Sequence, residues 1–355
     1  MPASPRSLPP ATLSEIVPPS SRHHYFHRFE EHPFDPRAGE FSVANAWWLA
    51  ELAMLAYGEE AFVREVLQER GVAPALGLEL TLIDGSTRGA RALVFETVDF
   101  VILVFRGTRI RLANDPFLAL SVPVVDPSDF LTDIDLRLDP DEHVHTGFKR
   151  SLDEVWDRIC SHLDRARSVR QPRPLWLTGH SLGAALATLA AARLSPTHAG
   201  GLVTLGSPRV GDGRFSARVT MPAWRVVNNT DIVTQLPPPT ALADYRHVGK
   251  LEFLDSRGVV VEEPPTLDVI ESNLRGHAEA LNQALSALNG QTIWEAGRAA
   301  VAALNAHLPK QVGPSIEALG LDLVPVAGIA DHMPIYYALK LWNALRHVAR
   351  DSASA

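Results

Sequence analysis

The sequence predicts an α/β fold in which a mostly parallel central sheet is covered by helices. Short runs of β-branched, aromatic and aliphatic residues recur at 78–83, 92–97, 100–105, 174–178, 201–206 and 224–228. The run at 100–105 is almost entirely apolar, which is typical of a strand buried on both faces. Helical stretches separate the later runs, and this alternation favours parallel strands joined by helical crossovers.

Helices are expected on both sides of these strands. Apolar residues at helical spacing over 41–57 predict a helix that covers one face of the sheet, and a second helix over 60–70 would end at Gly71. Residues 148–167 and 182–194 predict helices between parallel strands, and 334–349 predicts the last helix. Residues 245–263 predict a hairpin, because two strand-like runs flank a turn at 256–258.

The chain length of 355 residues suits one large domain with insertions. Residues 1–39 are rich in proline and histidine and lack periodicity, so we expect a flexible leader, followed by a domain over 40–355. Within that domain, 264–330 repeats leucine and alanine at helical spacings and predicts a helical insertion. The sequence shows no internal repeat and no change in composition sharp enough to mark a second independent domain.

Composition excludes several classes of protein. A net charge of −8 argues against a general nucleic-acid binder. The single cysteine, Cys160, permits no internal disulfide, and the first 24 residues hold no apolar run of signal-peptide length. Residues 174–192 lack charged residues, but glycines interrupt them, so a buried strand–turn–helix is expected rather than a membrane span. These features favour a cytoplasmic or non-classically exported protein.

The most informative motif is Gly179-His180-Ser181-Leu182-Gly183, which has the form G-x-S-x-G. It follows a predicted buried strand and opens a predicted helix, as a nucleophile elbow does, and this context favours the α/β-hydrolase fold. A sharp strand-to-helix turn exposes the serine hydroxyl, and glycines on either side remove side chains that would collide. The alternative is a glycine-rich turn with a purely structural role.

In this fold the acid and then the histidine follow the nucleophile along the chain. Asp231 is the best candidate acid, because it comes after the predicted strand 224–228, although it could instead cap a turn. Asp212 and Asp244 are weaker candidates, since neither directly follows a predicted strand. His332 is the best candidate base, because it lies at a junction before the last helix; the alternative is a histidine that merely starts that helix. The other downstream histidines lie on a predicted strand or on helices: His247, His277, His307 and His347.

An oxyanion hole in this fold uses the amide after the nucleophile and one amide from an earlier strand end. Those positions are Leu182 and Thr108, the latter after the strand 100–105 and Gly107. The alternative for the second position is a simple strand terminus. No cofactor and no metal are expected, because the acidic run over 126–142 lacks the spacing and glycine of a calcium loop.

Several separated segments resemble one family in the order that the family has them. They are NAWWLAELAMLAY, VILVFRGT, HVHTGF, LTGHSLGAALATLAA, TLGSPRVGD, RVVNNTDIVTQLPP, YRHVG and DHMPIYY. Together they resemble the class 3 lipases, which include fungal triacylglycerol lipases. The resemblance implies Ser181 as nucleophile, Asp231 as acid and His332 as base, with Thr108 and Leu182 in the oxyanion hole.

In that family a mobile lid follows the R-G-[ST] segment. Residues 109–128 are therefore a lid candidate, and they are apolar but broken by prolines. A buried loop is the alternative. The side chains that would cover the site and contact an acyl chain are Phe117, Leu118, Leu120 and Val122.

The sequence therefore predicts a serine hydrolase that cleaves lipid esters, as a triacylglycerol lipase or a phospholipase A1-like enzyme. A soluble carboxylesterase or feruloyl-type esterase on the same fold is the alternative, and a catalytically silent interaction module is a third. The expected partners are a lipid or other ester and a transient membrane or lipid interface. The oligomeric state stays unassigned.

Overall fold

The computed structural model describes residues 5–10, 13–86, 89–108, 138–169, 173–194, 199–237, 243–256, 258–261 and 327–354. The described residues form one eight-stranded sheet whose spatial order follows the chain from β1 to β8. Its strands are β1 (Glu79–Asp84), β2 (Arg91–Glu96), β3 (Val101–Phe105), β4 (Leu175–His180), β5 (Ala199–Leu205), β6 (Ala223–Asn228), β7 (Lys250–Leu254) and β8 (Val260–Val261).

The sheet is parallel at its centre and antiparallel at both edges. Strands β3 to β7 run parallel to one another, whereas β1, β2 and β8 pair antiparallel with their neighbours. The mostly parallel sheet is therefore confirmed, as is the hairpin that joins β7 to β8. His247 lies before β7 rather than inside a strand.

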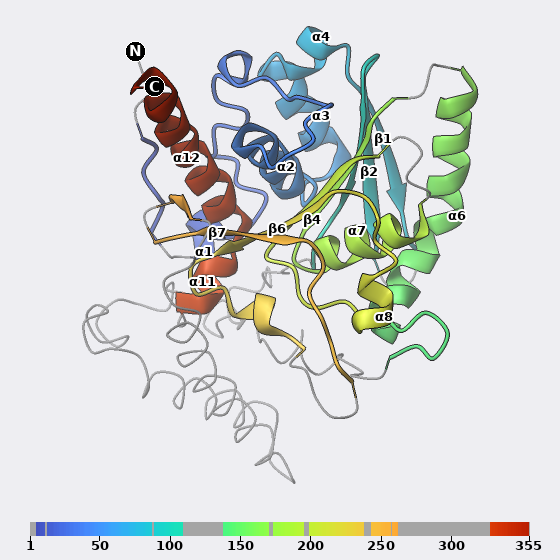
Figure 1. Ribbon diagram of the computed structural model, residues 1–355. Coiled ribbons are helices and arrows are strands. Elements are labelled where there is room, and N and C mark those ends of the chain that lie inside the picture. Colours follow the sequence, from blue (N-terminus) through green and yellow to red (C-terminus); the bar gives the residue numbers. More distant parts are fainter. Residues whose placement is uncertain are drawn as a thin grey trace, which may run out of the picture.

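Helices cover the two faces of this sheet, so the molecule has three layers (Figure 1). One face packs against α2 and α12, and the other packs against α6 and α7. The helices are α1 (Leu13–Ile16), η1 (Phe29–Glu31), α2 (Val43–Leu55), α3 (Glu60–Glu69), α4 (Val72–Leu76), α6 (Thr146–Val169), α7 (Leu182–Arg193), α8 (Gly213–Ser216), η2 (Ile232–Gln235), α11 (Ala327–His332) and α12 (Pro334–Ser354).

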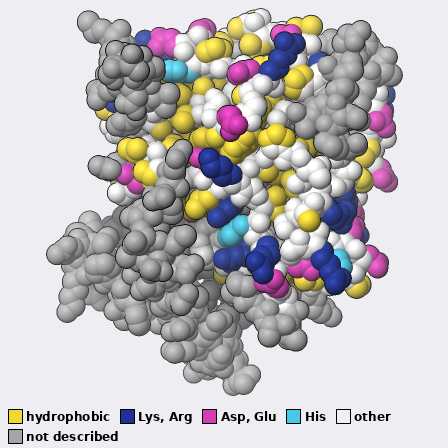
Figure 2. All heavy atoms as spheres, viewed as in Figure 1, with side chains coloured by type: hydrophobic (Ala, Val, Ile, Leu, Met, Phe, Trp, Pro, Cys, Tyr) yellow, Lys and Arg dark blue, Asp and Glu magenta, His cyan; other side chains and the backbone are white. Residues whose placement is uncertain are grey.

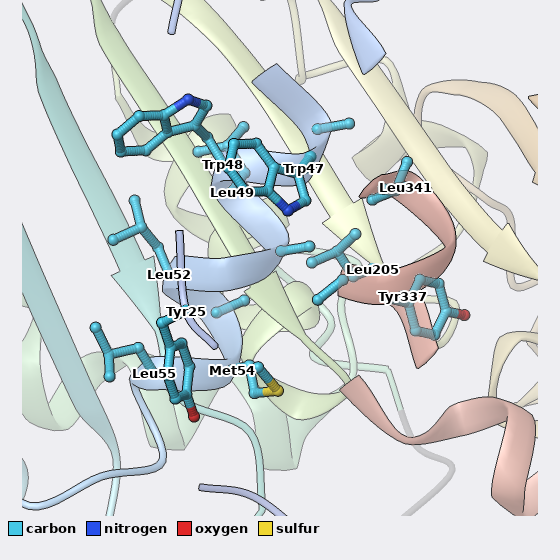
Figure 3. Packing of buried hydrophobic residues seen from close by; sticks show 14 of the residues in the cluster. Tyr25, Trp47, Trp48, Leu49, Leu52, Met54, Leu55, Leu205, Tyr337 and Leu341 are labelled. Carbon is cyan, nitrogen blue, oxygen red and sulfur yellow. The ribbon is translucent and has the colours of Figure 1, made fainter. Parts of the chain in front are cut away.

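The first face is covered by an unusually apolar helix. Eleven consecutive residues of α2, from Asn45 to Leu55, are buried, because the helix is enclosed by the sheet, by α12 and by the chain that precedes it. Figure 3 shows Leu205 of β5 and Tyr337 and Leu341 of α12 around the α2 side chains. Helix α12, and with it the chain that follows His332, is therefore fixed to the core.

The chain before α2 differs from the flexible leader that the sequence predicts. Ile16, Tyr25, Phe26, Phe29 and Phe34 are buried in the core that contains α2. Aromatic residues placed between the prolines supply enough apolar surface to order this irregular segment, which has no helical or strand period to reveal it. The boundary between residues 39 and 40 stays a prediction.

Two other predicted segments lie wholly or mostly outside the described residues. The lid candidate 109–128, with Phe117, Leu118, Leu120 and Val122, is one of them. The other is the helical insertion 264–330, of which α11 describes only the last residues. Both stay predictions. Among the described residues, no helix combines the length and hydropathy needed to cross a membrane.

Candidate active site

Ser181 lies in the elbow (residues 179–183), between the end of β4 and the start of α7. Its backbone has φ 59° and ψ −126°, a conformation that costs a non-glycine residue free energy and that neighbouring structure must enforce. Its backbone N–H donates to the Leu205 carbonyl at 3.0 Å. The strained turn predicted from the G-x-S-x-G motif is present.

The two glycines of the elbow allow the backbones of β3, β4 and the first turn of α7 to come into close contact. A Cβ on Gly183 would lie 2.1 Å from the carbonyl oxygen of Phe105, and one on Gly179 would lie 2.3 Å from the carbonyl carbon of Gly183. Neither contact involves a side chain that could move away. Helix α7 can therefore start directly above β3 and β4 only when both positions lack side chains.

We expect Gly183→Ala to lower the free energy of unfolding by about 3 kcal/mol, because the added methyl meets backbone rather than a flexible side chain. The gain in helix propensity from glycine to alanine, about 1 kcal/mol, is too small to offset this. Urea unfolding measures the effect. Gly213→Ala is the matched control, since nothing lies within 4 Å of a Cβ there; equal losses in both variants would contradict the packing argument.

Asp231 and His332 are in direct contact. His332 Nδ1 lies 2.8 Å and 3.0 Å from the two carboxylate oxygens of Asp231. Both residues are buried, with 1% of Asp231 and 7% of His332 exposed. The carboxylate thus accepts a hydrogen bond from the Nδ1–H group, which leaves Nε2 with a lone pair that can accept a proton from a nucleophile.

Two further donors compensate the buried charge of Asp231. Tyr337 Oη donates to Oδ2 at 2.6 Å, and the Val233 amide donates to Oδ1 at 2.9 Å. The second bond caps η2, so the alternative of a turn-capping aspartate is also realised. One carboxylate therefore orders the loop that carries it and orients His332.

The residues next to Ser181 contact this acid–histidine pair, and they place the serine close to it. A Cβ on Gly206, which follows Leu205, would lie 2.7 Å from Asp231 Oδ2 and 3.0 Å from His332 Nδ1. His180, which precedes the serine, contacts His332, with ring centroids 4.5 Å apart. The three residues proposed as a triad therefore gather at the carboxyl edge of the parallel strands.

His180 is a functional candidate that the sequence reasoning passed over. Its Nδ1 lies 2.9 Å from Tyr57 Oη, and its Nε2 lies 2.5 Å from the backbone carbonyl of His332. Burial, and secondarily the nearby His332, hold the pKa of His180 well below its ordinary value. A neutral imidazole then accepts from Tyr57 and donates to the His332 carbonyl. It therefore places no positive charge against the His332 ring.

A second set of polar contacts joins the acid loop (residues 229–237) to the residue before the histidine. The Asp331 carboxylate accepts hydrogen bonds from the Thr230 amide, the Thr230 hydroxyl and the Asn229 side chain. The Asn228 side chain donates to the Asp331 carbonyl at 2.7 Å and accepts from Lys340 Nζ at 2.6 Å. These bonds join the backbone next to Asp231 to the backbone next to His332. They therefore fix the position of the carboxylate relative to the imidazole.

The position of His332 is set by helix α11. The histidine is the last residue of α11, and α12 begins at Pro334. A proline cannot donate a backbone hydrogen bond, so the first helix ends and the second starts at this point. The break between the two helices lets the imidazole point away from the helix axis and toward Asp231.

The predicted oxyanion-hole residues border the elbow. Leu182 is the first residue of α7, where an α-helix leaves its amides without acceptors inside the helix. Thr108 is exposed and follows Gly107, at which a Cβ would lie 2.7 Å from the His180 carbonyl oxygen. Both positions suit donors directed at a charge on the substrate. Their roles stay predictions.

The weaker candidates lie elsewhere. Asp212 accepts from the Arg214 and Phe215 amides and caps α8, and the exposed Asp244 pairs with Arg246. His277 and His307 lie outside the described residues. His347 lies on α12, 15 positions beyond His332 in the chain and in its own helix.

Tyr337→Phe is expected to lower kcat roughly tenfold with little change in KM, because the variant removes a short hydrogen bond to a charged, buried carboxylate. Steady-state kinetics on a soluble ester measure this. Tyr336→Phe is the matched control, since Tyr336 Oη donates to the distant Pro9 carbonyl instead. An unchanged kcat in Tyr337→Phe would show that the bond does not support Asp231.

A parallel sheet with a serine on a strained strand-to-helix turn, and an acid–histidine pair beside it, defines the α/β-hydrolase class. Residues 102–241 match the family described as lipase (class 3). Over this part of its length the chain is similar to the class 3 lipases.

Individual relatives agree with this assignment. The chain is 39% identical over 116 residues to secreted mono- and diacylglycerol lipase 1 of Fusarium solani, covering 32% of this chain and 34% of the relative. It is 32% identical over 187 residues to a lipase of Rhizomucor miehei, covering 49% of this chain and 46% of the relative. The chain thus spans between a third and a half of these relatives.

Among solved structures, lipase II of Rhizopus niveus matches with a TM-score of 0.48 and 24% identity, over 60% of this chain and 81% of that one.

The expectation of a cytoplasmic or non-classically exported protein is wrong. The Fusarium solani relative is a secreted lipase. Composition and a lone cysteine permit folding in any compartment, so they did not determine the cellular address.

Proposed function

We propose that the protein is a serine hydrolase that cleaves carboxylic esters of lipids, as a triacylglycerol lipase or a phospholipase A1-like enzyme. The observation that carries the proposal is the buried Asp231–His332 pair, with Nδ1 held 2.8 Å from the carboxylate, beside a serine on a strained turn. The Fusarium solani relative, named for mono- and diacylglycerols, supports a glycerolipid substrate. It also supports an extracellular setting.

In the proposed mechanism, Ser181 Oγ attacks the ester carbonyl carbon while His332 Nε2 takes the hydroxyl proton. The new C–O bond turns the carbonyl oxygen into an oxyanion, which the amides of Leu182 and Thr108 stabilise. The intermediate collapses, the alcohol leaves with the proton from His332, and an acyl-enzyme remains. Water then attacks by the same route, and the carboxylic acid departs with Ser181 restored.

Asp231 stays ionised throughout in this scheme. It holds the Nδ1 proton and stabilises the imidazolium that forms in each half of the reaction. The neutral His180 beside it keeps the surroundings of His332 free of a second positive charge. The apolar segment 109–128 would cover the site and contact the acyl chain.

The substrate assignment is tested by parallel turnover of a triacylglycerol emulsion, phosphatidylcholine and p-nitrophenyl butyrate. A lipid esterase is expected to turn over at least one long-chain lipid faster than the short ester once the lipid forms an interface. Turnover confined to the soluble short ester would replace the lipid assignment with a carboxylesterase. No turnover and no labelling by a fluorophosphonate would reject the hydrolase itself.

A further inference from the structure

Two buried polar side chains lie beside the proposed triad and take no part in the steps described above. They are Tyr57, which comes two residues after the end of α2, and His180, which ends β4. On the visible surface, acidic side chains lie among the Lys and Arg side chains (Figure 2), where water and opposite charges screen them. Buried polar groups lack this screening, so their hydrogen bonds have a larger effect on the groups that they hold.

The partners of His180 determine which of its ring nitrogens carries the proton. Nε2 lies 2.5 Å from the backbone carbonyl oxygen of His332, and a carbonyl can only accept a hydrogen bond, so Nε2 carries the proton. Because burial, and secondarily His332, hold the pKa of His180 well below its ordinary value, the ring is neutral and Nδ1 has a lone pair. Burial raises the pKa of Tyr57, so its hydroxyl keeps its proton and donates to Nδ1 at 2.9 Å.

These two hydrogen bonds give His332 a second attachment. Asp231 holds the imidazole through Nδ1, whereas His180 holds the backbone of the same residue and lies against its ring, with centroids 4.5 Å apart. His180 also directly precedes Ser181 in the chain. The distance between the proposed nucleophile and the proposed base therefore depends on the bond from His180 to the His332 carbonyl.

Tyr57 connects these contacts to the strand end before Thr108, the predicted oxyanion donor. A Cβ on Gly107 would clash with Tyr57 Oη and would lie 2.7 Å from the carbonyl oxygen of His180. The tyrosine hydroxyl thus occupies the space that a side chain on Gly107 would need. The backbone that leads to Thr108 is therefore packed against both Tyr57 and His180.

We propose that Tyr57 and His180 are positioning residues for the ester hydrolysis proposed above, on which this inference rests. Tyr57 holds His180 in the tautomer with the proton on Nε2. In that tautomer His180 holds the His332 backbone at the distance from Ser181 that proton transfer requires. In the other tautomer the lone pairs of Nε2 and of the carbonyl oxygen would face each other, and this attachment of His332 would be lost. Both residues act through His332 and exchange no proton with the substrate.

The first test is Tyr57→Phe, which removes the donor to Nδ1 and keeps the aromatic ring. It is expected to lower kcat about tenfold, as for the loss of one buried hydrogen bond, and to change KM less than about twofold. Steady-state kinetics on p-nitrophenyl butyrate measure both constants. Tyr336→Phe is the matched control, because Tyr336 is also buried but donates to the Pro9 carbonyl. Its kcat is expected to match that of the wild type.

Two substitutions of His180 separate its two hydrogen bonds. His180→Gln places an amide N–H near the position of Nε2 and can still donate to the His332 carbonyl, whereas His180→Asn reaches only the position of Nδ1 and bonds Tyr57 alone. We expect His180→Gln to keep kcat within about tenfold of the wild type and His180→Asn to lower it on the order of 10²-fold. Adding Tyr57→Phe to His180→Gln is expected to leave kcat unchanged, because Tyr57 acts through His180. A merely structural role would lower the Tm of both His180 variants without separating their kcat values.

Nitrogen NMR of protein with labelled histidines supplies a readout that does not depend on turnover. The signals lost in His180→Gln identify the ring, which is expected to have Nε2 protonated in the wild type and a mixture of tautomers in Tyr57→Phe. A proton on Nδ1 in the wild type would overturn the proposal. So would an active wild type whose kcat is unchanged in Tyr57→Phe and equally reduced in both His180 variants, although the hydrolase itself would stand. A wild type that neither turns over esters nor reacts with a fluorophosphonate would instead reject the proposed function, and the positioning role with it.

Discussion

Ser181→Ala is expected to abolish labelling by a fluorophosphonate and to lower ester turnover by about 10⁴-fold or more. Without the hydroxyl no acyl-enzyme can form, and only the positioning and oxyanion donors would remain. Active-site titration followed by turnover on a chromogenic ester measures both effects. The variant is expected to keep its fold, since alanine retains the Cβ of the residue held in the strained turn and removes only the hydroxyl.

Ser207→Ala is the matched control for this substitution. Ser207 is also buried and lies just after β5, but its hydroxyl donates to the Pro208 carbonyl and takes no part in the proposed chemistry. Normal turnover is expected in the control. Persistent hydrolysis by Ser181→Ala, at more than a trace of the wild-type rate, would remove Ser181 from the mechanism.

Asp231→Asn is expected to lower kcat by on the order of 10³–10⁴-fold, with a much smaller effect on KM. The asparagine amide would donate to His332 Nδ1, so the imidazole proton would move to Nε2. The nitrogen that should accept the serine proton would then carry one already. Pre-steady-state acylation with a p-nitrophenyl ester measures the chemical step directly.

Asp244→Asn controls for the loss of a carboxylate as such, because Asp244 is exposed and paired with Arg246. Its kcat is expected to match that of the wild type. Asp231 also caps η2, so unfolding must be compared as well. A loss of activity that disappears when the variant is assayed well below its Tm would assign Asp231 a structural role and contradict the proposed one.

The central part of the fold could be predicted because its signals are local. The apolar runs at β3 and β4 are buried along their whole length, and such runs are typical of strands covered on both faces. The segment before α2 could not be predicted in the same way. Tyr25, Phe26 and Phe29 pack through irregular backbone, and only the tertiary structure shows which surfaces they meet.

The residues of the candidate site also fall into those that the sequence predicts and those that only the tertiary structure reveals. Ser181 is marked by a motif, and Asp231 and His332 by their order after it, so the contact between the last two could be expected. Tyr337, His180 and Lys340 act through contacts across 100 or more positions. A tyrosine or a lysine on an amphipathic helix gives no local signal that its polar end is buried, as Tyr337 is against Asp231 and Lys340 against Asn228.

The bonds between Asp331 and the acid loop have a consequence for how this chain can vary. Together with the Asn228 bond to Asp331, they connect residues separated by 101 to 103 positions, so the chain between these residues is anchored at both of its ends. The entropic cost of closing such a stretch rises only with the logarithm of its length, by about 0.6 kcal/mol per doubling. The connection between β8 and α11 could therefore become longer or shorter without displacing the imidazole from its carboxylate.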